Sequence, residues 1–385
     1  MHILTVTPYF PPTWAYGGIP RIVDGLSRAL VRLGHGVTVL TTDAYDGAAR
    51  APVPADRRHD GVRVLTVRNA SNTLAWRHQL FLPLGAPRAL AGLGRVDLVH
   101  LHGHRHLLNN AAVAWARRQG LPYVLTANGT LLRHERKQGL KVAWDLLVSG
   151  GIPAGAAACV AVSAADAAQH LQAGIPAERV VRIPNGLDLG EFEALPPRGT
   201  FRARHGLGDR PVVAYLGQIS PRKGVDHLIR AFDGGALGDA ALVIAGADRG
   251  WVQRPADGAH VRFTGVLEGA ERLALLSDAD VLVYASTAEV FGLVPFEGLL
   301  CGAPGVVGDD CGCGELIAEA GAGLLVRHAD VAGLRARIRT LLADRVAAEA
   351  MVARGRRYIR ANLGFEKVAS QHVELYETVL SRRSG

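Results

Sequence analysis

Short apolar runs alternate with longer stretches of helical spacing along most of the chain. In the first half these runs are mostly continuous rather than alternating with polar residues: His2–Thr7, Val37–Thr42, Val62–Val67, Leu98–His102, Tyr123–Asn128, Cys159–Ser163 and Val180–Pro184. Short continuous runs are typical of parallel strands that are covered on both faces. Between them lie helix-compatible segments such as Pro20–Leu33, which is followed by Gly34 in the manner of a helix C-cap. The pattern predicts repeated strand–helix units.

The pattern is interrupted at about residues 184–210 and then starts again. Pro184-Asn185-Gly186 is typical of a turn, and Pro196-Pro197-Arg198-Gly199 of a stiff polar connector. Beyond the connector the predicted strands are Val212–Gly217, Leu242–Gly246, Val261–Gly265, Val281–Ser286, Pro304–Gly308 and Leu324–Arg327. Repeated units of this kind take right-handed crossovers and form doubly wound parallel sheets. We therefore predict an α/β protein with two facing Rossmann-like domains and a ligand cleft between them.

The interruption sets the predicted domain boundaries. The N-terminal domain is expected to span residues 1–187 and the C-terminal domain residues 188–364. A final helix at about 365–385, within which Phe365–Leu380 has helical spacing of apolar residues, is expected to pack back on the N-terminal domain. The segment Asp43–Asp60, rich in Ala, Pro, Asp and Arg, is expected to be a mobile loop.

Length, cysteine content and hydropathy narrow the class of protein. A chain of 385 residues is long enough for two domains of ordinary size. Four cysteines in so long a chain do not form a disulfide framework, and Cys311-x-Cys313 lacks zinc-ribbon spacing, so buried thiols in a reducing compartment are favoured. The start of the chain does not resemble a signal peptide, and no apolar run approaches the ~18–20 residues of a membrane span. We expect a cytoplasmic enzyme.

The charge balance favours an anionic partner. The net charge of +8 and the pI near 9.6 suit a nucleotide, a membrane surface or a nucleic acid. Most of the positive residues are scattered arginines, so we expect no nucleic-acid partner. The stretch Leu131–Leu147 mixes Arg and Lys with Leu and Trp, which suits either an interfacial helix on anionic lipid or an ordinary amphipathic helix over the core. In the first case the enzyme would associate peripherally with the inner face of the cell membrane.

The most informative stretch is Ser286–Pro304, in which Glu289 and Glu297 flank a glycine-containing loop. A predicted strand ends at Ser286, and Pro295 suits a first helical turn. This arrangement aims backbone N–H groups and a helix N-terminus at one point, where a diphosphate is stabilised. Carboxylates beside it would accept hydrogen bonds from sugar and ribose hydroxyls. A pair of glutamates with this spacing alone is uninformative, because chance supplies several in a long chain.

Together with other segments, this stretch resembles the retaining glycosyltransferase family 4 (glycosyl transferases group 1), which adopts the GT-B fold. The resembling segments follow the family's order along the chain: Pro11–Ile19 with Leu33–Thr41, Asp97–Gly103, Pro184–Asp188, Leu216–Gly224 and Glu289–Pro304. The resemblance implies catalytic roles for His102, Lys223 and Glu289. It implies a donor-binding set of Gly17, Gly18, Gln218, Arg222, Lys223, Val266, Glu289, Phe291, Gly292, Leu293 and Glu297.

Each role has a physical reason. Lys223 would place a positive charge on the diphosphate of the leaving group. The family usually has Arg where this chain has Gln218, and a neutral amide cannot supply the same charge. Either neighbouring Arg222 compensates or the phosphate site is weaker. Glu289 would accept from hydroxyls of the donor sugar, and Glu297 from the ribose.

The N-terminal domain would contribute from the other side. Gly17-Gly18 would allow the backbone to approach phosphate or sugar. An imidazole at His102 would bind a hydroxyl or take a proton. Although His100, His104 and His106 lie nearby, no set of carboxylates accompanies them, and a metal site is not expected.

The resemblance implies transfer with retention of anomeric configuration, by front-side attack of the acceptor hydroxyl. The donor would be a UDP- or GDP-sugar such as GDP-mannose, with no cofactor and no obligatory metal. The expected acceptor is a saccharide or lipid-linked precursor in bacterial envelope or exopolysaccharide synthesis. A small natural product as acceptor, a GT-B sugar-nucleotide epimerase and a non-catalytic nucleotide-sugar-binding protein remain alternatives. A dehydrogenase is disfavoured, because the first strand leads into Thr7-Pro8 rather than a Gly-x-Gly-x-x-Gly turn.

Overall fold

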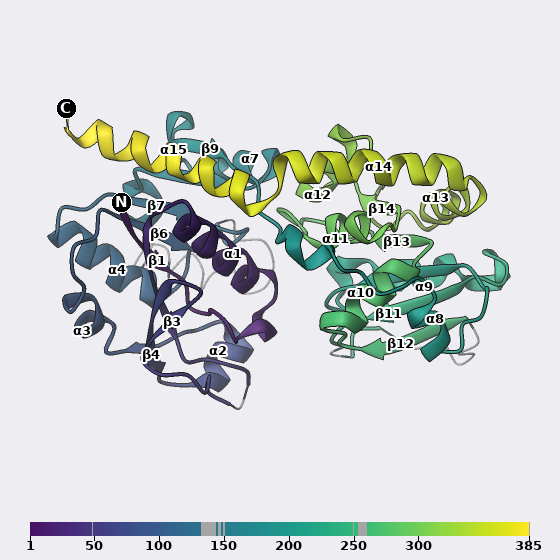
Figure 1. The fold of residues 1–385 in the computed structure, drawn as a ribbon, viewed down its shortest axis with the longest axis horizontal. Coiled ribbons are helices and arrows are strands. Elements are labelled where there is room, and N and C mark those ends of the chain that lie inside the picture. The colour runs from purple at the N-terminus through teal and green to yellow at the C-terminus, as the bar shows by residue number, and fades with distance from the viewer. Residues whose placement is uncertain are drawn as a thin grey trace. The chain divides into compact units, whose positions relative to one another are not determined.

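The computed structural model describes residues 1–47, 49–131, 144, 148, 151–248, 250–252 and 260–384. The chain splits into two compact units (Figure 1). Unit 1 consists of Met1–Leu187 and Leu363–Gly385, and unit 2 of Asp188–Asn362. Most of the stretch Leu131–Leu147, for which an amphipathic helix was considered, lies outside the described residues.

Unit 1 is built on a sheet with the strand order β3-β4-β2-β1-β6-β7-β8-β9, and β5 pairs with β4. Strands β1, β2, β4, β6, β7, β8 and β9 run parallel, whereas β3 and β5 are antiparallel to β4. The bounds are β1 His2–Val6, β2 Gly36–Thr42, β3 Asp56–His59, β4 Val62–Asn69, β5 Pro83–Leu84, β6 Leu98–His102, β7 Tyr123–Thr126, β8 Ala158–Ala161 and β9 Val180–Arg182.

The continuous apolar runs become the buried parallel strands of this sheet, as predicted. Strand β1 is almost fully buried along its length because helices cover both of its faces. The prediction of a mobile loop at Asp43–Asp60 is wrong for its last residues, since Asp56–His59 form the edge strand β3. This strand has the sequence Asp-Arg-Arg-His, without an apolar residue, which is common at a sheet edge exposed to water.

Helices α1 and α15 of unit 1 pack against one another. The helices of the unit are η1 Trp14–Tyr16, α1 Gly18–Arg32, α2 Asn72–His78, α3 Ala86–Ala91, α4 Leu107–Arg118, α6 Gly151–Gly155, α7 Ala164–Gln172, η3 Ala177–Arg179 and α15 Phe365–Ser384. The ring of Phe365, at the start of α15, lies against Gly25 of α1 and against Gly186, where a Cβ would come within 2.0 and 2.3 Å of its carbons. Both glycines are therefore required by this close approach.

Unit 2 has the strand order β12-β11-β10-β13-β14-β15, with all neighbours parallel. The strands are β10 Val212–Leu216, β11 Ala241–Ala245, β12 Val261–Gly265, β13 Val281–Tyr284, β14 Gly305–Gly308 and β15 Gly323–Val326. In chain order within the unit this is 3-2-1-4-5-6, the dinucleotide-binding arrangement. The order reverses between β10 and β13, so a ligand crevice is expected beyond the carboxyl ends of these two strands.

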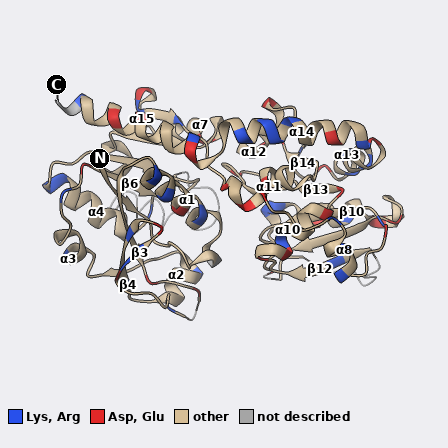
Figure 2. Cartoon of the chain, in the orientation of Figure 1, with Lys and Arg blue, Asp and Glu red and all other residues tan. Residues whose placement is uncertain are grey.

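The helices of unit 2 connect these strands. They are η4 Leu189–Phe192, α8 Thr200–Arg204, η5 Pro221–Lys223, α9 Val225–Ala231, η6 Asp233–Gly235, α10 Gly269–Asp278, α11 Val294–Cys301, α12 Gly312–Glu319, α13 Val331–Ala343 and α14 Arg345–Asn362. Lys and Arg recur on helices of both units (Figure 2). In the part of the chain that the structure describes, no helix combines the length and the apolar character that crossing a membrane requires.

Candidate active site

The loops that follow β10 and β11 lie very close together in unit 2. Gly217 follows β10 with φ +147°, and Gly246 follows β11 with φ +151°. A Cβ at Gly246 would lie 1.7 Å from the carbonyl oxygen of Gly217, so only glycine fits there. The chain after Gly217 is thereby held at the carboxyl end of the sheet, where it forms the short helix η5 that ends at Lys223.

A hydrogen-bonded cluster joins Lys223 to the end of β13. The Lys223 ammonium donates to the Tyr284 hydroxyl at 2.8 Å and forms an ion pair with the Glu289 carboxylate. The Tyr284 and Ser286 hydroxyls donate to the same Glu289 oxygen at 3.3 and 3.4 Å. The Lys223 Nζ also lies 4.8 Å from the centroid of the Tyr284 ring, a cation–π distance. The switch point between β10 and β13 therefore carries a positive charge held by an acidic partner.

Burial and charge oppose one another at Glu289. Burial raises the pKa of this carboxyl, but the neighbouring charge and hydrogen bonds of Lys223 outweigh it, so the pKa lies below its ordinary value. Burial, together with the Glu289 charge, raises the pKa of the Tyr284 hydroxyl well above its ordinary value. Glu289 is thus ionised and Tyr284 protonated at neutral pH. The hydroxyl can act as a donor but not as a base.

The backbone beside Glu289 is strained. Ala288 has φ +53°, which is unusual for a residue with a Cβ and costs on the order of 1 kcal/mol or more. Gly292 has φ +85°, and a Cβ there would come within 3.0 Å of the Cys313 sulfur and of the Tyr284 ring. Leu293 is the N-cap of α11, and Pro295 lies in its first turn as predicted. The loop is therefore shaped by its neighbours rather than by its own preferences.

Glu297 lies in the first turn of α11 and is almost fully buried. Arg272 of α10 donates to a Glu297 carboxylate oxygen at 2.6 Å and pairs through its other terminal nitrogen with Glu191 of η4. The Arg272 side chain is only 4% exposed. This arginine orients the Glu297 carboxylate, and it has no place in the sequence motifs.

The remaining candidates of unit 2 differ in exposure. Gln218 and Arg222 are exposed in the loop after β10, and Val266, which directly follows β12, is 61% exposed. Phe291 is buried, with its ring centroid 5.4 Å from that of Phe296. Phe291 therefore supports the loop from inside, while the other three side chains face solvent.

In unit 1, the glycine pair lies at the start of a long helix. Gly17 has φ +98° and is the N-cap of α1, whose first residue is Gly18. Both glycines are exposed. Exposed backbone N–H groups at the N-terminus of a helix form a favourable environment for an anion.

His102 is the last residue of β6 and is 2% exposed. Burial lowers the pKa of its ring to about 3, with the nearby His372 lowering it further, so the ring is neutral. Within the described residues, neither ring nitrogen of His102 has a hydrogen-bond partner. The ring lines a small cavity together with Thr126, Asn185 and His372. In the described residues the hydrogen-bonding capacity of this ring is therefore not used by the protein.

His100 lies two residues before His102 and faces the same side of the sheet, as strand alternation predicts. The two ring centroids are 4.2 Å apart. His100 forms hydrogen bonds with Thr126 Oγ1 and with the Tyr376 hydroxyl of α15, both at 2.7 Å. Among the described residues, no group of three or more His, Cys, Asp or Glu is arranged to hold a metal ion. The four cysteines are free and buried.

Comparison with known proteins identifies the family. The family model described as Glycosyltransferase Family 4 matches residues 16–191, and Glycosyl transferases group 1 matches residues 197–358. The chain is 28% identical over 406 residues to the glycogen synthase of Mycobacterium tuberculosis, covering 98% of this chain and 94% of that protein. It is 30% identical over 378 residues to the GDP-mannose-dependent alpha-mannosyltransferase of Mycolicibacterium smegmatis, covering 94% and 93%. The chain belongs to glycosyltransferase family 4.

Solved structures agree with this assignment. The family 4 chain superposes on the sucrose-phosphate synthase of Thermosynechococcus elongatus with a TM-score of 0.76 and 23% identity, covering 99% of both chains. The predicted GT-B fold is thereby confirmed. Glycosyltransferase activity follows from the family matches and the relatives rather than from this superposition.

The structure groups the predicted residues of this family 4 glycosyltransferase into separate sets. In unit 2, Lys223 and Glu289 are in direct contact, and Glu297 lies on the next helix with Arg272. In unit 1, Gly17, Gly18 and His102 follow or end the adjacent strands β1 and β6. Sequence reasoning missed Tyr284 and Arg272. Tyr284 had a usable signal, because it lies near the end of the predicted strand Val281–Ser286, just before the glutamate loop.

Proposed function

We propose that this family 4 enzyme transfers a sugar, with retention and without an obligatory metal, from a UDP- or GDP-sugar to an acceptor hydroxyl. The ion pair between Lys223 and Glu289 at the switch point of unit 2 carries the proposal. The ion pair fixes the Lys223 ammonium near the carboxyl ends of β10 and β13, which is where parallel α/β sheets with this strand order bind their ligands.

Lys223 would stabilise the charge that develops on the departing nucleoside diphosphate. In transfer from a nucleotide sugar, breaking the sugar–phosphate bond leaves negative charge on the phosphate oxygens. A point charge fixed in advance stabilises that state without reorganising during the reaction. Glu289 and Tyr284 hold the Lys223 ammonium in place. Exposed Arg222 lies in the same loop and would add the charge that Gln218 lacks.

The other candidates would position the donor. Glu297, oriented by Arg272, would accept from ribose hydroxyls, and the backbone at Val266 would face the base. Gly17 and Gly18 at the N-terminus of α1 would bind phosphate or sugar. His102 would bind a hydroxyl of the transferred sugar through a ring nitrogen. Lys223 in this scheme takes the role that a divalent metal plays elsewhere.

Front-side attack accounts for retention. Retaining glycosidases hold two carboxyl groups about 5 Å apart, and one of them acts as the nucleophile. Here Glu289 forms an ion pair with Lys223, and Glu297 forms an ion pair with Arg272. Because each carboxylate is paired with a cation, neither is suited to attack carbon as a nucleophile. The acceptor hydroxyl would attack from the side of the departing phosphate, which takes its proton.

The donor and acceptor classes are supported by similarity. One relative is named for GDP-mannose, which favours GDP-mannose as the donor. Two others are named for glycogen synthesis and for phosphatidylinositol monomannoside, which favours a saccharide or lipid-linked acceptor. Peripheral association with an anionic membrane stays a prediction, since its candidate segment lies outside the described residues.

The proposal is tested by donor binding and turnover in matched variants. Thermal shifts with UDP, GDP, ADP and their common sugar conjugates identify the base, since a ligand at a hundredfold excess over its dissociation constant stabilises by about 2.7 kcal/mol. With the donor so identified, Lys223→Met should lower kcat by about 100-fold or more. Lys367→Met, which removes the same charge from an exposed position on α15, should not. Equal turnover in both variants would remove Lys223 from the mechanism.

Stereochemistry and metal dependence are separate readouts. Proton NMR of the first product formed should show the anomeric configuration of the donor sugar. Activity should persist in excess EDTA. An inverted product, or full loss of activity restored by a divalent ion, would contradict the corresponding part of the proposal.

A further inference from the structure

Unit 2 contains a pocket at the opposite ends of the strands whose following loops carry Lys223 and Glu289. Its volume is about 560 Å³, within the usual range of small-molecule sites. Pro211, Asp280 and Pro304 line it, and each directly precedes a strand: β10, β13 and β14 respectively. The candidate donor residues follow the carboxyl ends of these strands instead. The pocket is therefore distinct from the candidate active site.

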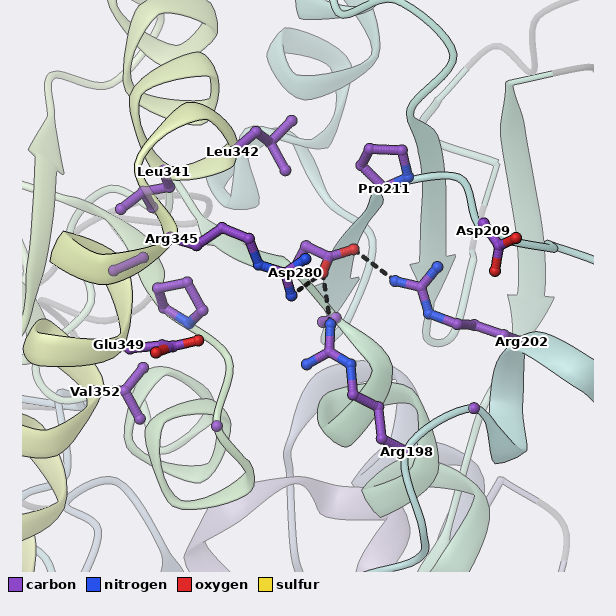
Figure 3. Close-up of a pocket in the computed structure, with 15 residues that line it drawn as sticks. Arg198, Arg202, Asp209, Pro211, Asp280, Leu341, Leu342, Arg345, Glu349 and Val352 are labelled. Carbon is purple, nitrogen blue, oxygen red and sulfur yellow. Dashed lines mark hydrogen bonds and ion pairs between the residues drawn. The ribbon is translucent and has the colours of Figure 1, made fainter.

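A carboxylate at the centre of the pocket fixes its structural framework (Figure 3). Asp280 accepts the backbone N–H of Val212 at 2.8 Å and the Arg202 guanidinium at 2.5 Å. Arg202 donates in addition to the carbonyl oxygens of Arg210 at 2.5 Å and Asp278 at 3.0 Å. The Arg202 side chain is only 14% exposed, and its terminal nitrogens are engaged with protein acceptors that hold the pocket together.

Two further arginines approach the same carboxylate from the pocket side. Arg198 places a terminal nitrogen 2.5 Å from Asp280 Oδ1, and its side chain is 50% exposed. Arg345 is 3.7 Å from the same oxygen and 69% exposed. One carboxylate thus faces three guanidiniums, and each guanidinium has five N–H donors. N–H donors of Arg198 and Arg345 therefore remain for a ligand that lies between these two side chains.

The helix that carries Arg345 adds to this preference. Arg345 is the first residue of α14, which has 18 residues, so the positive end of the helix dipole lies at the pocket. A bidentate guanidinium contact is the common way in which proteins bind a phosphate group. The part of the pocket beside Asp280 is therefore suited to a phosphate.

The rest of the lining is suited to a hydroxylated body. Figure 3 shows Asp209 and Glu349 on opposite sides of the arginine–Asp280 group. Their carboxylates can accept hydrogen bonds from hydroxyls, and they disfavour a second anionic group. Leu341, Leu342 and Val352 supply apolar surface for the face of a sugar ring. The volume is far larger than inorganic phosphate needs.

We propose that this pocket binds a phosphorylated monosaccharide, with its phosphate between Arg198 and Arg345 and its hydroxyls toward Glu349. The site belongs to unit 2 alone and does not depend on the donor assignments made above. Its occupant is a second ligand, bound in addition to the nucleotide sugar.

Isothermal titration of the full chain with glucose 6-phosphate, glucose 1-phosphate and mannose 6-phosphate tests the proposal. At least one of them should bind saturably at millimolar concentration or below, more tightly than inorganic phosphate, while glucose should not bind. Arg198→Gln and Arg345→Gln should each weaken that binding about tenfold or more. Arg357→Gln, which removes the same charge from an exposed position farther along α14, should not.

Further measurements separate this site from the donor site. Lys223→Met should bind the sugar phosphate as the unmodified chain does, and saturating nucleotide should not displace it. Three results would each overturn the proposal: no binding by any of these sugar phosphates, affinity equal to that of inorganic phosphate, or affinity unchanged in both Arg198→Gln and Arg345→Gln. Displacement by nucleotide would likewise assign the binding to the donor site. Circular dichroism of each variant checks that the fold is retained.

Discussion

Unit 1 should be unusually sensitive to mild acid, because it buries histidine rings that cannot accept a proton while folded. The rings of His100, His102, His106 and His372 are each 6% exposed or less. Burial lowers the pKa of His102 to about 3 and of His106 and His372 to about 4. The pKa of His100 lies well below its ordinary value for the same reason. When the chain unfolds, all of these rings become ordinary histidines with pKa values near 6.5.

The direction and size of the effect follow from proton linkage. Below about pH 6.5 the unfolded state binds protons that the folded state does not, so the free energy of unfolding falls as the pH falls. Each ring contributes about 1.4 kcal/mol per pH unit until its folded pKa is reached. Taken together, the four rings should lower the free energy of unfolding of unit 1 by about 5 kcal/mol between neutral pH and about pH 5.5. A domain typically has only 5–15 kcal/mol to lose, so unit 1 should be close to unfolding near pH 5.

Tryptophan fluorescence reports mainly on the unfolding of unit 1, because most of the tryptophans belong to this unit. Trp14, Trp76, Trp115 and Trp144 belong to unit 1, whereas unit 2 has Trp251. Urea unfolding should be measured by fluorescence at about pH 7.5, 6.5 and 5.5, with the free energy extrapolated to water at each pH.

A matched pair of variants assigns the effect to the buried rings. His372→Gln removes one buried ring and should reduce the slope of free energy against pH by about 1.4 kcal/mol per unit. His78→Gln changes an exposed ring on α2 and should leave the slope as it is. An unfolding free energy that is the same at about pH 7.5 and pH 5.5 would refute the reasoning, because it would mean that the rings are hydrated in the folded state.

Three further predictions concern unit 2. Arg272→Met should lower its free energy of unfolding by about 3–5 kcal/mol, since it removes the charged partner of the buried Glu297 carboxylate. Adding Glu297→Gln should restore part of that loss, and additive costs in a double-mutant cycle would contradict the ion pair. Gly246→Ala should reduce soluble yield and melting temperature, because its Cβ would overlap the Gly217 carbonyl; an unchanged melting curve would disprove this crossing of the loops. The folded pKa of Glu289 lies below its ordinary value of 4.5, so its ion pair stabilises fully above that value and is lost as the pH falls through the folded pKa. At neutral pH the amides of unit 2 should be better protected against hydrogen exchange in the unmodified chain than in Glu289→Gln, and this difference should disappear in acid. A difference in protection that is the same at both pH values would argue against the ion pair.

The parallel strands could be predicted from the sequence because burial on both faces leaves a continuous apolar run. The predicted Leu98–His102 and Val261–Gly265 coincide with the observed strands β6 and β12. Strand β3 could not be found in this way, since Asp56–His59 contains no apolar residue and is held by pairing with β4. An edge strand of this kind depends on its neighbour rather than on its own composition.

The candidate site was predicted residue by residue but not as an arrangement. Lys223 and Glu289 meet because β10 and β13 are neighbours, and that adjacency arises from the strand order rather than from any local spacing. Arg272 has the same difficulty, because an arginine on an amphipathic helix gives no sign that it is buried against a glutamate. Contacts between distant segments, such as Tyr376 with His100, require the tertiary fold to be known.

Unit 1 contains segments from both sides of unit 2 in the sequence. Its first segment is therefore translated before unit 2, and its helix α15 is translated after unit 2. The ring of Phe365, which covers Gly25 and Gly186, is translated only after the whole of unit 2. Until then Gly25 and Gly186 lack the ring that covers them in the finished unit. Removing α15 should therefore leave unit 2 correctly folded and unit 1 prone to aggregation, so the quality control of this chain depends on its last helix.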